Sequence, residues 1–402
     1  MVLQTLKMGF ISIATFMCIL GTVHQTRSAT IRNLTHKNMD FAMNFYRKIS
    51  SNHDENIFFS PMSISTTFAA LSMGSSGVTQ QEILKGLSLD KLEQAADPEL
   101  IPKLFQQLHG NITHNGSLNL DQSTSFFVCQ QFEVQKTFED QIKMFFDADI
   151  KPVDFTDTTE TISIINEYIQ NKTRDKVTDM ISTLDALTQL MLINTVFFQE
   201  EWQAPFDPSH TQNEAFYIDN YNVVHVPMMF QEGKFYTADI PLGAKVLKLP
   251  YQEGVAMLIL LPNKGTDYTL IDSEINASRF LSWIKHLKKV KVEVHMPKFK
   301  LEQSYSLHDL LPDLGVVSVF SNSANLTRMS MNKALKVSEV LHKAVIDVDE
   351  SGTTAAAGTT TGIVAYSLPR TFYINRPFFF FIYHENTNSL LFMGRVTDPT
   401  KN

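Results

Sequence analysis

The stretch that decides the fold is ESGTTAAAGTTTGIVAYSLPR, which runs from Glu350 to Arg370. No charged residue lies between its two ends, and its side chains are small as far as Ile363. The flanking segments, residues 335–348 and 372–382, are rich in β-branched and aromatic residues, a pattern that predicts buried strands. Two strands are usually connected by about 4–6 residues, so a connection of this length is expected to be functional or disordered.

Two interpretations of this stretch are open. Its glycine, threonine and alanine content is compatible with a flexible linker. Threonine, however, favours a pleated surface, whereas solvated linkers are typically rich in Ser, Lys, Glu or Pro. If residues from Thr353 to Ile363 formed a strand, both faces would carry small, uncharged side chains up to Ile363. The stretch can therefore be a loop that later becomes a strand between existing neighbours.

The first part of this stretch resembles the hinge of the reactive-centre loop of the serpins. It consists of the acidic residue Glu350 and, after one serine, Gly352, Thr353, Thr354, Ala355, Ala356, Ala357 and Gly358. Further on, the sequence RPF at residues 376–378 fits the family's carboxy-terminal signature. The resemblance implies an α+β serpin fold of the clade A type, with three β-sheets, eight or nine helices and an exposed reactive-centre loop at residues 350–370. It also implies that this loop, once cut, enters the main sheet as an extra strand.

The resemblance covers residues 38–398, so one serpin domain without an internal boundary is expected. It places a hydrogen-bonded cluster beneath the main sheet, which governs how readily the sheet opens, at Ser60, Ser63, Asn194 and His342. Trp202 matches the family's breach, at the end of the sheet where insertion starts. The chain departs from the family at Tyr168, usually Trp, and at Asp175, usually Gly.

The reactive bond follows from the family's spacing. Serpins are cut fourteen residues beyond the hinge glycine, and counting from Gly352 predicts cleavage between Tyr366 and Ser367. Arg370 is an alternative bait residue, but it lies four residues nearer the fixed strand, where a protease would reach it poorly.

The residues at this bond, with Ala365 before them, resemble those of a serpin that regulates coagulation. That resemblance implies coagulation factors Xa and XIa as targets, protein Z as a protein cofactor and heparin as an accelerator. It also implies a contact surface for the cofactor protein at Asp219, Tyr221 and Asp272. The alternative interpretation of Tyr221 is an ordinary exposed aromatic residue in a turn.

Tyrosine is a poor bait for an arginine-directed protease, so a cofactor protein would have to supply affinity by raising the effective concentration. Without such a cofactor, a chymotrypsin-like protease is the better target. A non-inhibitory hormone carrier is a further alternative, because Thr354 stands where the family usually has Glu. A secreted adhesion or structural protein would need no insertable loop.

Several features predict export. Residues 1–28 are expected to be a signal peptide with a possible processing site, because Lys7 precedes an apolar run that is too short to span a bilayer. Residues 29–37 are expected to form a flexible tail. Six glycosylation sequons support secretion: Asn33, Asn111, Asn115, Asn171, Asn276 and Asn325. Cys129 would be the sole cysteine of the mature chain, among apolar neighbours, and is expected to be inert.

The chain carries no motif of an enzyme. It has no GxSxG elbow, no HExxH, no phosphate-binding loop and no CxxC pair, so neither catalytic residues nor a metal is expected.

The net charge of −8 argues against nucleic acid as a principal partner. One basic run, KHLKKVK at residues 285–291, is either a solvated helix face or a polyanion site. A monomer without a transmembrane segment is implied.

Local signals predict some helix ends. Ser60 before Pro61 predicts an N-cap followed by proline at the first helical position. Thr79 and Glu82 form a capping box that predicts a helix start and an end near Gly86.

Overall fold

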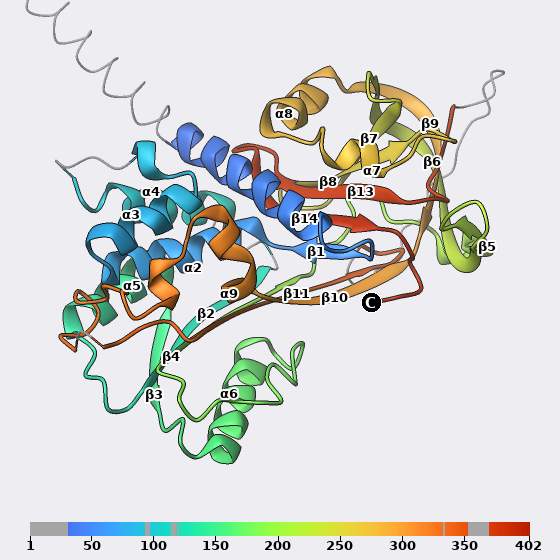
Figure 1. Ribbon diagram of the computed structural model, residues 1–402. Coiled ribbons are helices and arrows are strands. Elements are labelled where there is room, and N and C mark those ends of the chain that lie inside the picture. Colours follow the sequence, from blue (N-terminus) through green and yellow to red (C-terminus); the bar gives the residue numbers. More distant parts are fainter. Residues whose placement is uncertain (1–30, 93–96, 114–117, 119, 333, 353–369) are drawn as a thin grey trace, which may run out of the picture.

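The computed structural model describes residues 31–92, 97–113, 118, 120–332, 334–352 and 370–402. The expected serpin fold is confirmed, with helices packed around two hydrogen-bonded sheets (Figure 1). The helices are a helix over residues 31–50, α2 (Pro61–Gly74), α3 (Gly77–Gly86), α4 (Leu100–Thr113), α5 (Lys136–Phe146), α6 (Thr158–Lys172), α7 (Thr269–Asp272), α8 (Ala277–His286) and α9 (Leu307–Leu310). The strands are β1 (Ile57–Phe59), β2 (Leu120–Cys129), β3 (Asp149–Val153), β4 (Leu190–Phe198), β5 (Gln212–Tyr217), β6 (Val223–Ile240), β7 (Ala244–Pro250), β8 (Val255–Pro262), β9 (Lys288–Pro297), β10 (Phe299–Ser306), β11 (Glu339–Val348), β12 (Arg370–Tyr373), β13 (Phe378–His384) and β14 (Ser389–Val396).

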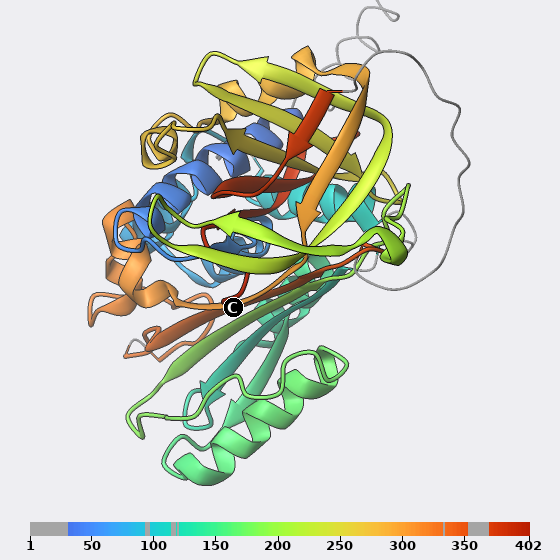
Figure 2. The same ribbon diagram turned by 90° about the vertical axis from the view of Figure 1, so that its right-hand side faces the viewer.

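The main sheet has five strands in the order β10-β11-β4-β2-β3. Its β11 and β4 run parallel to each other, with Glu339 opposite Met191 and Ile346 opposite Phe198. The helix α2 packs on one face of this sheet, and α6 crosses the other face (Figure 2). All nine residues of β4 are buried, in keeping with a sequence that is apolar except at Asn194 and Thr195.

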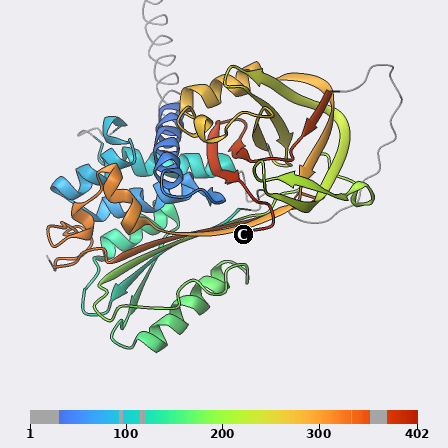
Figure 3. The ribbon, with the colours of Figure 1, turned by 45° about the vertical axis from the view of Figure 1, so that its right-hand side comes forward.

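The other strands form one nine-stranded sheet, whereas two separate sheets were expected beside the main sheet. The two are continuous because β6 is 18 residues long and pairs with β5 along its first part and with β7 along its last. This sheet curls above the main sheet, with α8 against it (Figure 3). The predicted strand at residues 372–382 is divided into β12 and β13 around Pro377, which has no N–H to donate to a ladder.

Two helix predictions are confirmed in part. The Ser60 side chain accepts a hydrogen bond from the Ser63 N–H, and Pro61 opens α2, as expected. The helix α3 ends at Gly86 as predicted, but it begins at Gly77 rather than at the predicted capping box. Thr79 and Glu82 instead bond residues elsewhere in the fold, since Glu82 accepts from the N–H groups of residues 317 and 318.

The expected flexible tail and the basic run also differ from expectation. The described residues 31–37 of this segment are already helical, and Leu34 and Thr35 are buried in the core. The basic run is no single helix face, because it spans the end of α8 and the start of β9.

Candidate functional site

The candidate site begins where β11 ends, at the hinge glycine. Gly352 forms bridges with both Asp349 and Glu201, so it closes a tight turn at the top of the main sheet. Its backbone has a φ of +120°, which favours glycine. A Cβ atom at this position would lie 2.4 Å from the Glu200 carbonyl oxygen and 2.5 Å from the Trp202 nitrogen. The hinge therefore requires glycine for both its conformation and its packing.

Glu350 fixes the residues just before the hinge. Its carboxylate lies 2.7 Å from the Lys298 Nζ and accepts a hydrogen bond from the Thr211 hydroxyl, also at 2.7 Å. Burial raises the pKa of Glu350, but the hydrogen bonds from Lys298 and Thr211 outweigh it and lower that pKa below its usual value. The carboxylate is therefore charged and links β11 to the loop before β10 and to the residues before β5.

Trp202 covers the same turn from the other side. Its backbone N–H donates to the Ser351 carbonyl at 2.8 Å, and its indole N–H donates to the Asp349 carbonyl at 3.0 Å. The indole ring stacks on Tyr251 at 4.1 Å between centroids. Trp202 thus lies at the end of the sheet expected for the breach, and it holds the chain on either side of Glu350.

The four residues expected beneath the sheet do form one hydrogen-bonded cluster. They are Ser60, Ser63, Asn194 and His342, and all are buried. The His342 Nε2 accepts from the Ser60 N–H at 3.1 Å, so its Nδ1 carries the proton and donates to the Asn194 Oδ1 at 2.7 Å. The same Asn194 oxygen accepts from the Ser63 hydroxyl at 2.7 Å. Burial lowers the pKa of His342 from 6.5 to about 3, so the imidazole is neutral.

This cluster joins neighbouring strands of the main sheet. His342 on β11 is the register partner of Asn194 on β4. The Asn194 amide also donates to Thr124 on β2, at 3.1 Å. Because both ring nitrogens of His342 are occupied, it is no general base, and its role is to hold β11, β4 and α2 together.

The expected cofactor surface is placed in part. Asp219 and Tyr221 lie in the turn between β5 and β6, and Tyr221 is 93% exposed. The Asp219 carboxylate accepts from the Asn222 amide and from the N–H groups of Tyr221 and Asn222, each at 2.7 Å, and these hydrogen bonds lower the pKa of Asp219. The turn is therefore rigid and presents an aromatic side chain to solvent.

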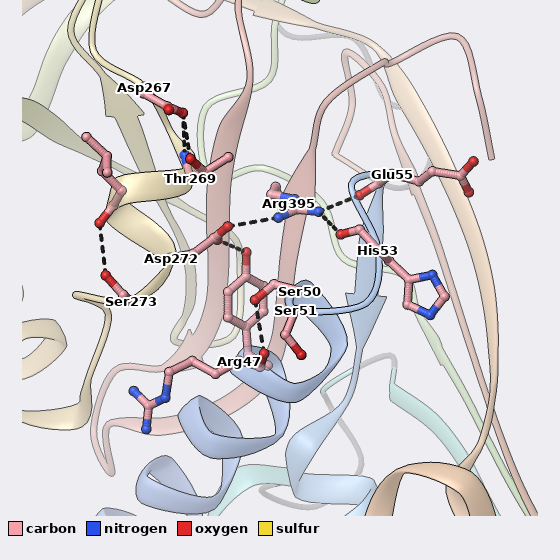
Figure 4. Close-up of polar contacts among 12 residues, drawn as sticks. Arg47, Ser50, Ser51, His53, Glu55, Asp267, Thr269, Asp272, Ser273 and Arg395 are labelled. Atoms are coloured by element: carbon pink, nitrogen blue, oxygen red, sulfur yellow. Dashed lines mark hydrogen bonds and ion pairs between the residues drawn. The ribbon is translucent and has the colours of Figure 1, made fainter.

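Asp272 is internal, not at the exposed position expected of a contact residue. Its side chain is 14% exposed and lies 3.0 Å from the guanidinium of Arg395, which is itself buried. Arg395 also donates to the carbonyl groups of His53 and Glu55 (Figure 4). Asp272 further accepts from the Tyr46 hydroxyl, so it ties α7 to β14 and to the helix over residues 31–50.

The loop itself lies outside the described residues. This applies to the reactive bond at Tyr366 and Ser367, to residues 353–358 of the hinge, to the signal peptide and to the sequon at Asn115. Arg370 is described and begins β12, which pairs with β9, so the far side of the loop ends in a sheet strand.

The remaining sequons differ in their surroundings. Asn33, Asn111 and Asn171 are exposed. Asn276 is half-buried and caps α8 by accepting from the Arg279 N–H, while Asn325 is half-buried and accepts from the Thr327 hydroxyl. Glycosylation of all five stays a prediction.

Sequence reasoning missed several residues of the hinge. Lys298, Thr211 and Tyr251 contact Glu350 or Trp202, yet they lie far from these residues in sequence. The acidic charge of Glu350 pointed to a basic partner but could not select one.

Among the described residues, no cluster of His, Cys, Asp or Glu could hold a metal ion. In the same ranges, no helix has the length and apolar character needed to cross a bilayer.

Comparison with known proteins matches residues 36–399 to the model of the family described as "Serpin (serine protease inhibitor)". Protein Z-dependent protease inhibitor of Mus musculus is 38% identical over 371 residues, which cover 92% of this chain and 83% of that protein. The crystal structure of the mouse protein matches with a TM-score of 0.86 at 36% identity, over 92% of this chain and 99% of that one. Human thyroxine-binding globulin in complex with thyroxine also matches with a TM-score of 0.86, at 30% identity over 92% of this chain and 99% of that one.

Proposed function

The chain belongs to the serpin family of serine protease inhibitors, and from that premise we propose that it is a secreted suicide substrate cut between Tyr366 and Ser367. The target's serine attacks the Tyr366 carbonyl, an acyl ester forms, and Ser367 becomes a new amino terminus. The freed segment from Gly352 to Tyr366 then enters the main sheet before water can hydrolyse the ester.

One observation carries this proposal: β11 and β4 pair in parallel directly beneath the hinge. A strand that runs back from Gly352 between them would be antiparallel to both neighbours. Antiparallel pairs are slightly more stable per residue than parallel ones, so insertion replaces one weaker pairing with two stronger ones. The buried cluster around His342 and Asn194 sets the cost of separating the two strands.

The register of the turn supports an estimate of where the inserted segment would end. Asp349 already pairs with Gly352, and extending this pairing places Ile363 opposite Ser338 and Tyr366 opposite Leu335. The segment from Gly352 to Tyr366 spans about 50 Å at roughly 3.3 Å per residue. The acyl ester would therefore travel from one end of the sheet to the other.

The energy of insertion comes from the new strand. Each additional ladder hydrogen bond contributes about 0.5–1.5 kcal/mol, which sums to the order of 10 kcal/mol over the strand. Distortion of an active site by about 1 Å can slow a reaction roughly a hundredfold, so deacylation of the dragged protease would stall. The uncut protein is then metastable, and its lifetime is set by a rate.

We further propose that the targets are factor Xa, inhibited with protein Z as cofactor, and factor XIa, with heparin as an accelerator. The name and 38% identity of the mouse relative support a protein Z-dependent inhibitor. The exposed Tyr221 on its rigid turn supports a docking surface for a cofactor protein. Asp272 is left out of this surface because its carboxylate is used inside the fold.

The experiment is incubation with factor Xa, factor XIa and chymotrypsin, each with and without protein Z and phospholipid. We expect a complex that survives SDS, and a released peptide that begins at Ser367. The variant Thr353→Arg would place a bulky charge in the inserted strand and turn the inhibitor into a substrate, whereas the matched variant Thr353→Ser would still form the complex. If Thr353→Arg traps proteases as efficiently as the parent, insertion is not the trap.

A second candidate function is that of a non-inhibitory carrier. The similarity to human thyroxine-binding globulin favours it, as does Thr354 at a position where the family usually has Glu. A carrier would be cut without forming any SDS-stable complex. The same incubation therefore separates it from an inhibitor of a chymotrypsin-like protease, which would trap chymotrypsin without protein Z.

A further inference from the structure

A cavity of about 750 Å³ lies between α8, the end of β6 and the start of β9. Its apolar lining includes Ile240, Leu242, Trp283 and Val290, and Trp283 and Ile240 are buried at its base. α8 packs against β6 here, and Arg279, Trp283 and His286 of α8 line one side of the cavity. A volume of this size with a mainly hydrophobic base is typical of a site for a small organic molecule.

The polar residues of this cavity are mostly basic. Lys288 and Arg370 both line it and are exposed, and neither has an ion-pair partner within the described part of the chain. Arg279 also lines it but is neutralised by Glu274 at 2.5 Å. The acidic residue of the lining, Asp239, stands opposite Lys245 in the ladder of β6 and β7. Lys288 and Arg370 outnumber Asp239, so a ligand in the cavity meets a net positive charge.

We propose that this cavity binds an amphipathic anion, namely a small apolar molecule with one carboxylate group, of the fatty acid type. The apolar part would cover Ile240 and Trp283, and the carboxylate would accept hydrogen bonds from Lys288 and Arg370. Hydrogen bonds between charged groups are the strong ones, and they fix the orientation of such a ligand.

Charge and shape together favour this class over a polyanion. A sulfated polysaccharide would engage the exposed basic run at residues 285–291 as a whole and would leave the buried indole of Trp283 unused. The cavity contains Lys288 from that run but not Lys285. These two lysines therefore distinguish a ligand inside the cavity from one that lies along the surface.

The test is titration calorimetry of the full-length protein with sodium laurate below its micelle concentration, with dodecanol and inorganic sulfate as probes of each half of the ligand. We expect one laurate per chain, with dodecanol and sulfate bound at least about tenfold more weakly. The double variant Lys288→Gln and Arg370→Gln should weaken laurate binding roughly tenfold or more, whereas the matched variant Lys285→Gln should change it less than about twofold.

Other outcomes overturn the proposal. The proposal is wrong if laurate does not bind the parent protein. It is also wrong if Lys285→Gln weakens laurate binding as much as the double variant Lys288→Gln and Arg370→Gln does. A heparin fragment that binds the parent, while laurate does not, would assign this surface to a polyanion. Val290→Phe, which narrows the cavity without changing its charge, should also abolish laurate binding. Melting curves of each variant show whether a loss of binding comes from the site or from unfolding of the protein.

Discussion

Replacing Gly352 by alanine tests the hinge geometry directly. The added Cβ would lie 2.4 Å from the Glu200 oxygen, 2.5 Å from the Trp202 nitrogen and 2.8 Å from the Glu201 Cα. All three atoms belong to the backbone, so no side chain can rotate away. Strain at a positive φ costs about 1–3 kcal/mol, and moving the backbone apart adds to it, for a total of roughly 2–4 kcal/mol.

The expected change can be measured as a shift in melting temperature. Unfolding entropy is about 2.1 cal/mol/K per residue, or roughly 0.8 kcal/mol/K for a domain of this size, so Gly352→Ala should melt about 3–5 °C lower. The intact protein must be scanned at one fixed rate, because its stability is kinetic.

Gly110→Ala is the matched control for this prediction. Gly110 lies in α4 with nothing within 4 Å of an added Cβ, and alanine favours a helix over glycine by up to about 1 kcal/mol. The control should therefore melt at the parent temperature or slightly above it. If Gly352→Ala has the same melting temperature as Gly110→Ala, Gly352 is not packed against the backbone of residues 200–202 as described.

Three further outcomes are expected. His342 has a pKa of about 3 in the fold and about 6.5 when unfolded, so the unfolded chain binds an extra proton and the free energy of unfolding falls as the pH drops from 6.5 to 3. His342→Gln removes this group, so in denaturant titrations the variant should lose less stability than the parent over this pH range, with a difference of up to a few kcal/mol. Glu350→Gln and Lys298→Met should each speed the uptake of a synthetic peptide copying residues 353–366, and the double variant should add little, because both remove one ion pair. Asp272→Ala leaves Arg395 buried without its carboxylate and should lower the melting temperature by about 4–6 °C, equivalent to about 3–5 kcal/mol.

Local sequence was sufficient for elements whose signal lies within a few residues. The cap formed by Ser60 was predicted correctly because it depends only on Pro61 and Ser63, which lie within three residues of it. The start of α3 was predicted wrongly because Thr79 and Glu82 make their hydrogen bonds to residues more than 200 positions away. Such partners are set by the fold, and no pattern in the local sequence specifies them.

The site shows the same division. The family resemblance selected Ser60, Ser63, Asn194 and His342, and these residues do contact one another. It did not indicate that Asp272 would be internal, because an acidic residue in a helix can serve a surface contact or a buried arginine equally well. Only the position of Arg395 on β14 decides between the two.

The measurement that tests the account most directly compares the melting temperature of the intact protein with that of the protein cut between Gly352 and Arg370. Insertion worth the order of 10 kcal/mol should raise the melting temperature of the cut form by at least roughly 10 °C. Equal melting temperatures for the two forms would mean that no strand had been added to the main sheet, and would contradict the proposed mechanism.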